Sequence, residues 1–236
     1  MRNIERSVRF IQSHKAIIIC CAAALALWWW FAPNSPRVSM PSALGNGLIA
    51  CPAVPPVVRP GQEPLQTEVP RGLGPFVFPG VTLTPLAGFS MEARVLSRKN
   101  YRFDDFAMLS HVDLFVGWGV MAKDEIVKDL PFYQAVRHGG IEGSKVGYNM
   151  PISYDVAYQN ASNVHLIPAN MRVARAISRI GVDDYVRIDG WLVSAVTPQG
   201  WRTMSSLSRD DRGTGACEII LVCNVAQLAK PYGNTR

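Results

Sequence analysis

The sequence predicts a mainly β fold with added α-helix (α+β), preceded by one transmembrane helix and a Pro-rich stalk. Three observations predict it: a single apolar run near the N-terminus, a concentration of prolines directly after it, and period-two alternation of apolar and polar residues further on. We therefore divide the chain into a cytoplasmic basic segment (1–15), an anchor (16–32), a stalk (33–75), a β-rich periplasmic domain (76–230) and a tail (231–236).

The apolar run from Ala16 to Phe31 predicts an uncleaved membrane anchor. About 20 apolar residues span the hydrocarbon core, with a working range of roughly 17 to 25, and Ala32 brings the run to its lower edge. Three tryptophans end the run, where indole rings favour the headgroup region. Several basic residues precede the run and few follow it. The positive-inside rule therefore places the N-terminus in the cytoplasm and the domain in the periplasm, with the run in a bacterial inner membrane. A cleaved signal peptide is the alternative, but bulky aromatic residues occupy the position where cleavage needs small ones.

The stalk and the charge distribution set limits on possible partners. Ten of the chain's 17 prolines fall between Pro33 and Pro75, which is typical of a semi-rigid spacer, with a PxxP recognition site as the alternative. The chain has a net charge of +6, but residues 76–236 carry only +2. Nucleic-acid binding needs a concentrated basic face. The sequence therefore predicts no nucleic-acid partner; its expected partners are the membrane, through residues 16–32, and an envelope protein.

Alternating and continuous apolar runs predict the strands of the domain. Residues 89–95 alternate as a half-buried strand does, and residues 185–194 do the same. A turn at residues 198–200 precedes a returning strand over 201–207. Residues 217–225 are apolar on both faces, which predicts a central strand covered on both sides.

Two helices are expected beside these strands. Met171, Ala174, Ile177 and Ile180 form an apolar stripe at helical spacing, with Asn170 as N-cap. A second helix is expected over 123–130. Together with the strands, this order resembles a small OB-like β-barrel with one or two packed helices.

Three cysteines lie outside the expected anchor, in an oxidising compartment if the domain is periplasmic. Cys217 and Cys223 lie six residues apart on one expected strand, about 20 Å from each other, which is too far for a disulfide. Cys51 is free to pair with either, and a buried free cysteine remains the alternative for each.

No established catalytic or metal-binding motif occurs, so the sequence predicts no cofactor, no metal and no assigned reaction. His111, His138 and His165 with Asp113, Asp155, Asp183 and Asp184 are the residues from which a metal site or a Ser/His/Asp arrangement would be built, but their spacing is not diagnostic. His165 has apolar neighbours, which favour a core histidine over a ligand. Trp118, between two glycines, is consistent with a ligand platform or a core indole.

The segment from Ser205 to Gly215 is the main binding candidate, because it concentrates hydroxyls, charges and glycines between two strands. An internally paired surface loop is the alternative. We expect Arg209 or Arg212 to grip an anion or carboxylate. The predicted binding residues are therefore Ser206, Arg209, Asp210, Arg212, His111, Trp118 and His165, whereas the arginines of helix 171–180 are expected to form a solvated face.

Four motifs, at residues 98–104, 112–119, 163–169 and 200–218, resemble a family of bacterial membrane or exported proteins of unassigned function. The resemblance covers roughly residues 76–225 and implies a bacterial source and a shared fold, with no activity attached.

The expected function is a membrane-anchored periplasmic binding or accessory domain for an envelope component. The alternative is an envelope hydrolase that acts on an anionic or glycan substrate through the 205–212 loop and a histidine. An enzyme would bring a histidine, an acid and that loop into one cleft, which separates the two hypotheses.

Overall fold

The computed structural model describes residues 2–31, 37–45, 51, 63–143, 150–208 and 215–230. The chain divides into two units, Met1–Arg37 and Val38–Arg236. The first unit contains one helix, α1 (Arg2–Phe31), which includes the apolar run from Ala16. In the part of the chain that is described, no helix reaches the length and apolarity that crossing a membrane requires.

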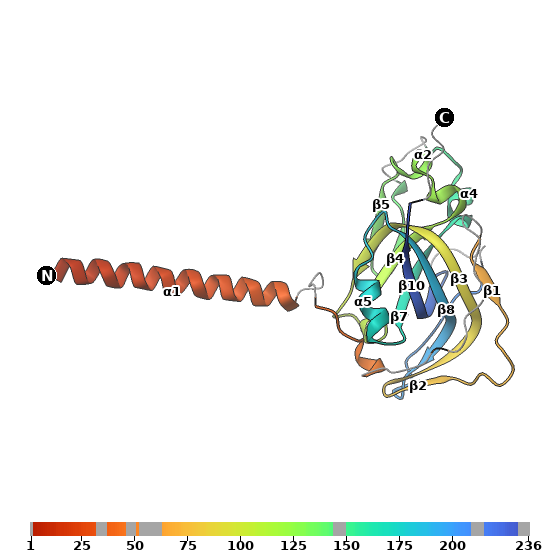
Figure 1. Cartoon of the computed structure of the whole chain (residues 1–236), viewed down its shortest axis with the longest axis horizontal. Helices are drawn as coiled ribbons and strands as arrows, with labels where there is room; N and C mark the ends of the chain where they lie inside the picture. The colour runs from red at the N-terminus through yellow and green to blue at the C-terminus, as the bar shows by residue number, and fades with distance from the viewer. Residues whose placement is uncertain are drawn as a thin grey trace. The chain divides into compact units, whose positions relative to one another are not determined.

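The second unit is mixed α+β and mainly sheet, as the sequence predicts (Figure 1). Its longest strand, β3 (Val81–Asn100), pairs with β8 along its first part and with β4 along its second. Register shifts interrupt both ladders, between Pro85 and Ala87 and between Val95 and Ser97. Such irregularities bend a strand and increase its twist, which lets β3 contribute to both sides of the sheet.

The strand pairings form a closed circuit. From β3 they run through β4 (Val112–Gly117), β7 (Ala161–Pro168), β10 (Glu218–Leu228) and β8 (Tyr185–Val196), and β8 pairs with β3 again. The β7–β10 pairing is parallel and the other four are antiparallel. Three short strands pair with β3 or β8 beside the circuit: β1 (Leu65–Thr67), β2 (Phe76–Phe78) and β9 (Arg202–Met204).

Helix α5 (Met171–Ser178) connects β7 to β8 and packs against β7 and β10 (Figure 1). It begins at Asn170, whose side chain accepts a hydrogen bond from the backbone N–H of Val173, so the predicted N-cap is confirmed. Val173 and Ile177 face the strands and are buried.

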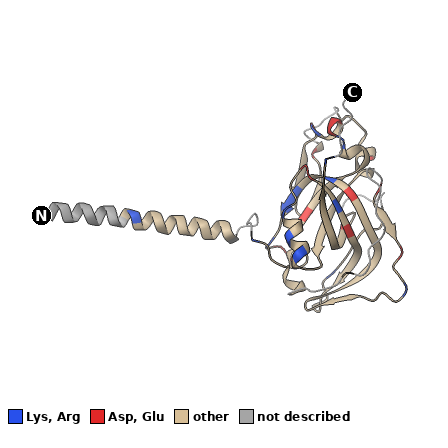
Figure 2. Cartoon of the chain, in the orientation of Figure 1, with Lys and Arg blue, Asp and Glu red and all other residues tan. Residues whose placement is uncertain are grey.

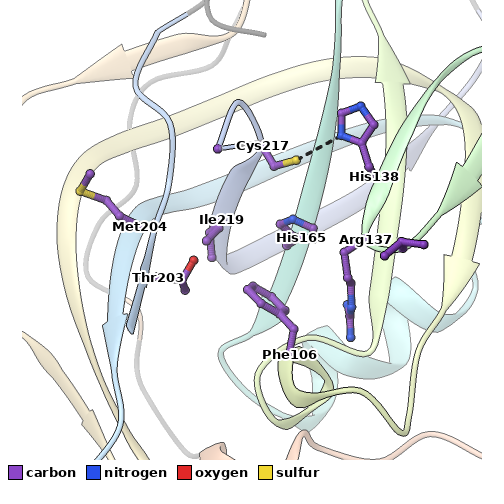
Figure 3. Close-up of a pocket in the computed structure, with 10 residues that line it drawn as sticks. Phe106, Arg137, His138, His165, Thr203, Met204, Cys217 and Ile219 are labelled. Carbon is purple, nitrogen blue, oxygen red and sulfur yellow. Dashed lines mark hydrogen bonds between the residues drawn. The ribbon is translucent and has the colours of Figure 1, made fainter. Parts of the chain in front are cut away.

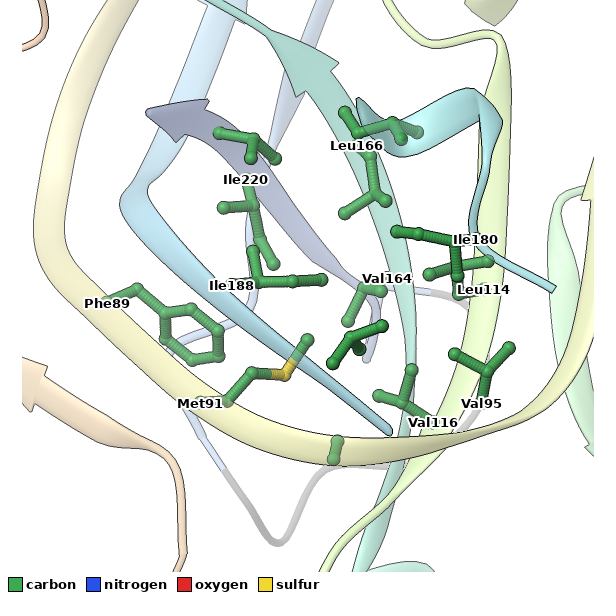
Figure 4. Close-up of a cluster of buried hydrophobic side chains, with 14 of the residues drawn as sticks. Phe89, Met91, Val95, Leu114, Val116, Val164, Leu166, Ile180, Ile188 and Ile220 are labelled. Carbon is green, nitrogen blue, oxygen red and sulfur yellow. The ribbon is translucent and has the colours of Figure 1, made fainter. Parts of the chain in front are cut away.

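Alternate residues of the five circuit strands form one apolar cluster (Figure 4). Their period of two places every second side chain on the same face. Because all five strands contribute, this cluster is the core that holds the circuit together. Among its members are Phe89, Met91, Val95, Leu114, Val116, Val164, Leu166, Ile188 and Ile220.

The opposite face of β7, β8 and β10 is covered by the N-terminal part of the unit. Leu44 of the 3₁₀ helix η1 (Ser42–Leu44) and Phe76 of β2 pack there beside Trp191. A disulfide joins Cys51 to Cys223 on β10. Residues 33–75 were expected to form a stalk. The residues of this range that are described from Val38 onward belong to the second unit, because their apolar side chains pack on this face of the sheet.

A third cluster lies around a separate two-stranded sheet, β5 (Phe132–Ala135) and β6 (His138–Ile141). Two short α-helices and a 3₁₀ helix accompany it: α2 (Asp124–Val127), α4 (Tyr154–Gln159) and η3 (Gly119–Ala122). The helix expected over 123–130 is thus a single turn. A Cβ at Gly139 would lie 2.6 Å from Oε1 of Gln134 and 2.8 Å from Oδ1 of Asn163, so only glycine lets the β5–β6 hairpin approach β7 this closely.

Replacing Ile188 by Ala is expected to lower the free energy of unfolding by about 2 to 5 kcal/mol, because Ile188 is fully buried in the circuit core. Urea denaturation measures the change. Val77→Ala is the matched control, since Val77 is 74% exposed and should change stability by less than about 0.5 kcal/mol. Equal effects of the two substitutions would contradict the assigned register.

Candidate functional site

The candidate site is a pocket of about 360 Å³ (Figure 3). It lies on the face of β7 and β10 that is turned away from the circuit core. Two histidines, one arginine and a free cysteine line it beside apolar side chains. The lining residues are Phe106, Val136, Arg137, His138, His165, Thr203, Met204, Gly215, Cys217 and Ile219.

The pairing registers place the central residues in a row across three strands. Asp113 on β4 lies opposite His165 on β7, and His165 lies opposite Ile219 on β10. Cys217 directly precedes β10, two residues before Ile219, and its side chain therefore falls on the same face. Backbone pairing thus fixes Asp113, His165 and Ile219 relative to one another, and Cys217 lies directly before the paired part of β10.

His165 connects the acid to the thiol. Its Nδ1 lies 2.9 Å from Oδ1 of Asp113. Burial alone would lower the pKa of His165, but its interactions with Asp113 and Cys217 raise that pKa to about 9. The imidazole is therefore protonated at neutral pH. In Figure 3 it lies between the Cys217–His138 pair and Phe106, whose ring centroid is 4.8 Å away.

Asp113 is fully buried, and a second cation holds its carboxylate in place. Nη1 of Arg137 donates to Oδ1 of Asp113 at 2.8 Å. The same guanidinium donates to Asp104 and to the backbone carbonyl of Ser110, and it lies 3.9 Å from the ring centroid of Tyr101. A buried carboxylate needs such charged partners, because leaving it unpaired costs several kcal/mol.

Arg137 reaches this position from the turn of the β5–β6 hairpin. Val136 and Arg137 have φ angles of 50° and 64°, the left-handed region that glycine and asparagine usually occupy. Neither side chain suits this conformation, and a β-branched valine suits it least. The contacts of Arg137 with Asp104 and Asp113 explain how the turn is maintained, since such backbone strain persists only where the surroundings over-determine it.

Polar groups also surround the sulfur of Cys217. Nδ2 of Asn163 donates to Sγ at 3.5 Å, and Nδ1 of His138 lies 3.9 Å from Sγ. Nε2 of Gln134 donates to Oδ1 of Asn163, which fixes the orientation of that amide. Burial and the charge of His165 together lower the pKa of His138, so His138 is neutral at pH 7.

No protein-family model, curated protein or solved structure matches this chain.

The structure brings together only some of the residues expected from the sequence. His165 lines the pocket, while Arg209, Asp210 and Arg212 lie outside the described residues. Ser206 is beside the site: its backbone N–H donates to the carbonyl of Cys217 and thereby positions the residue before β10.

The other expected residues lie elsewhere. Trp118 is buried in the circuit core, where it fits the core alternative, and His111 is not among the pocket residues. Asp183 contacts Arg94, and Asp184 contacts Gln227, so neither belongs to the site. The arginines of α5, Arg172 and Arg175, are exposed along the helix (Figure 2).

Asp113 and His138 were considered only as members of a larger set of acids and histidines, and Cys217 only as a disulfide partner. Arg137 and Phe106 carry no signal in the sequence, and Asn163 enters only as the first residue of the 163–169 motif. Within the described ranges, no group of three or more histidine, cysteine, aspartate or glutamate side chains has the geometry of a metal site. The described side chains of the site supply a thiol, imidazoles and a carboxylate.

The raised pKa of His165 predicts a pH dependence of stability. A pKa of about 9 in the folded state, against 6.5 for an unperturbed histidine, means that the stabilisation is complete below pH 6.5 and is lost as the pH rises through 9. Urea unfolding at pH 6, 8 and 9.5 measures this loss. His165→Gln should flatten the profile over that window, and an unchanged slope in the variant would assign the loss to other groups.

Proposed function

We propose that the domain is a cysteine-dependent acyl hydrolase, with Cys217 as nucleophile, His165 as acid and base, and Asp113 as the group that orients His165. The observation that carries the proposal is the arrangement of a carboxylate on β4, an imidazole opposite it on β7 and a thiol directly before β10. A nucleophile, a base and a third group that orients the base are the recurring parts of such enzymes. His165 and one end of the 205–215 segment, Gly215, line the same pocket, and the Asp113 carboxylate lies beside His165, which favours the hydrolase alternative over a binding module.

The proposed reaction begins with the protonated His165 beside the sulfur. The thiolate form of a cysteine is the nucleophile in such reactions. Sγ attacks the carbonyl carbon of the substrate, and the leaving alcohol, thiol or amine takes its proton from His165. Water then attacks the thioester, gives one proton to His165, and releases the carboxylic acid together with the regenerated thiolate. The net change is hydrolysis of one acyl bond by one water molecule.

Two further residues support these steps. Asn163 donates toward the sulfur, so its amide is placed to donate to the oxygen that becomes negative as the carbonyl is attacked. Arg137 holds Asp113 and is a positioning residue, because its own N–H groups are directed at Asp104, Asp113 and Ser110.

The scaffold of this site is, in our proposal, the OB-like barrel expected from the sequence. Two observations support that interpretation. The pairings of the five circuit strands return to β3, and helix α5 lies between β7 and β8, the third and fourth of these strands in chain order.

We also propose that the domain is periplasmic and tethered to the inner membrane by residues 16–32, with its partners in the envelope. The support is the basic segment before the apolar run and the disulfide between Cys51 and Cys223, since structural disulfides persist in oxidising compartments.

The reaction is tested with p-nitrophenyl acetate, an activated ester. The protein should release p-nitrophenol and carry an acetyl group on Cys217, detected by mass spectrometry of the peptide. Cys217→Ala should reduce the rate to background, and His165→Ala should reduce it by at least about 100-fold. A variant with both Cys20 and Cys21 replaced by Ser is the matched control for free thiols and should keep the full rate. Acetylation elsewhere, or full activity in Cys217→Ala, would show that Cys217 is not the nucleophile.

The topology is tested with reporters fused after Arg236. A reporter active only in the periplasm should be active, and one active only in the cytoplasm should be silent, because the basic residues precede the apolar run. The reverse pattern would refute the proposed location.

A further inference from the structure

Part of the pocket lining is apolar, and we call this part the apolar wall. Phe106, Met204 and Ile219 line it together with Val136. Phe106 packs on His165 and, edge to face, on Trp201, so its ring is fixed in position. A substrate whose carbonyl lies at Cys217 would therefore extend over hydrophobic side chains.

Two of these apolar residues are strongly exposed. Val136 is 90% exposed and Met204 is 66% exposed, although both line the pocket. Isolated exposed apolar residues are common, but these two line the same cavity, and the first is held there by a strained turn. Their exposed surface is available for a ligand to cover.

The charges of the described pocket residues are already used within the protein. The guanidinium of Arg137 donates to Asp104, to Asp113 and to the carbonyl of Ser110. The protonated ring of His165 interacts with Asp113 and Cys217. Among the described residues, the pocket thus offers no uncommitted cation to an anionic acyl group, and it offers an apolar wall instead.

We propose that the substrate is an ester or thioester of an uncharged aliphatic acid, whose chain covers Phe106, Met204, Ile219 and Val136. This inference rests on the proposed acyl hydrolase function and specifies its substrate class. A pocket of about 360 Å³ lies at the small end of ligand sites, so the chain is short to medium in length.

The experiment compares p-nitrophenyl acetate, butyrate and octanoate with a p-nitrophenyl ester of succinic acid that carries a free carboxylate. We expect kcat/KM to rise about fourfold for each methylene group that the wall covers, and then to level off once the pocket is filled. The succinate ester should be hydrolysed more slowly than the butyrate ester, which has the same number of acyl carbons.

Variants of the wall identify where the chain binds. Met204→Asn should lower the octanoate-to-acetate ratio of kcat/KM by roughly tenfold, because the polar side chain no longer offers apolar surface to the chain. Val77→Asn is the matched control, since Val77 is as exposed as Met204 but lies on β2, outside the pocket lining. It should leave the ratio unchanged.

The outcomes separate the two proposals. A Cys217-dependent rate that is independent of chain length, or that is highest for the succinate ester, would overturn the aliphatic substrate and leave the hydrolase intact. An unchanged ratio in Met204→Asn would also overturn it. If no ester is hydrolysed, including the acetate, the hydrolase itself fails, and the inference fails with it.

Discussion

The ion-pair contacts of the buried carboxylate of Asp113 are the interaction on which the candidate site depends. Asp113 on β4 contacts His165 on β7 and Arg137 on the β5–β6 hairpin, so one carboxylate joins three segments that are separate in the sequence. Because a buried charge without partners is costly, the hairpin, the strained turn and the orientation of the imidazole are coupled. Stabilisation of the fold and orientation of the His165 imidazole are therefore two effects of the same contacts.

Much of the fold follows from local patterns in the sequence. Period-two alternation identifies the strands that include Phe89 and Ile188, and the stripe behind Asn170 identifies α5, because in each of these segments one face is buried against the core. The region between 97 and 165 was predicted poorly. Its strands β4 and β7 are buried on both faces, so their sequences do not alternate, and the helix at 123–130 is shortened to one turn whose bounds depend on tertiary contacts.

The candidate site was predictable only in part, because its residues are far apart in the sequence and are brought together by strand pairing. His165 was a candidate because of its residue type, but its partner Asp113 lies 52 positions earlier and meets it only through strand pairing. The cysteine count could have pointed to Cys217. Three cysteines lie outside the apolar run, so one disulfide leaves one free thiol. A free thiol in such a domain is a candidate reactive group. The positive φ of Arg137 has no counterpart in its sequence, where no glycine or asparagine marks the turn.

The disulfide between Cys51 and Cys223 also has a mechanical consequence. Tension along the chain from the N-terminus toward the C-terminus passes through the sulfur–sulfur bond and enters β10 directly. Residues 52–222 form a covalent loop that carries none of this load, and Asp113, His165 and Cys217 all lie inside it. A domain held by its N-terminal segment can thus be pulled without stretching the chain that builds its site, for as long as the bond stays oxidised.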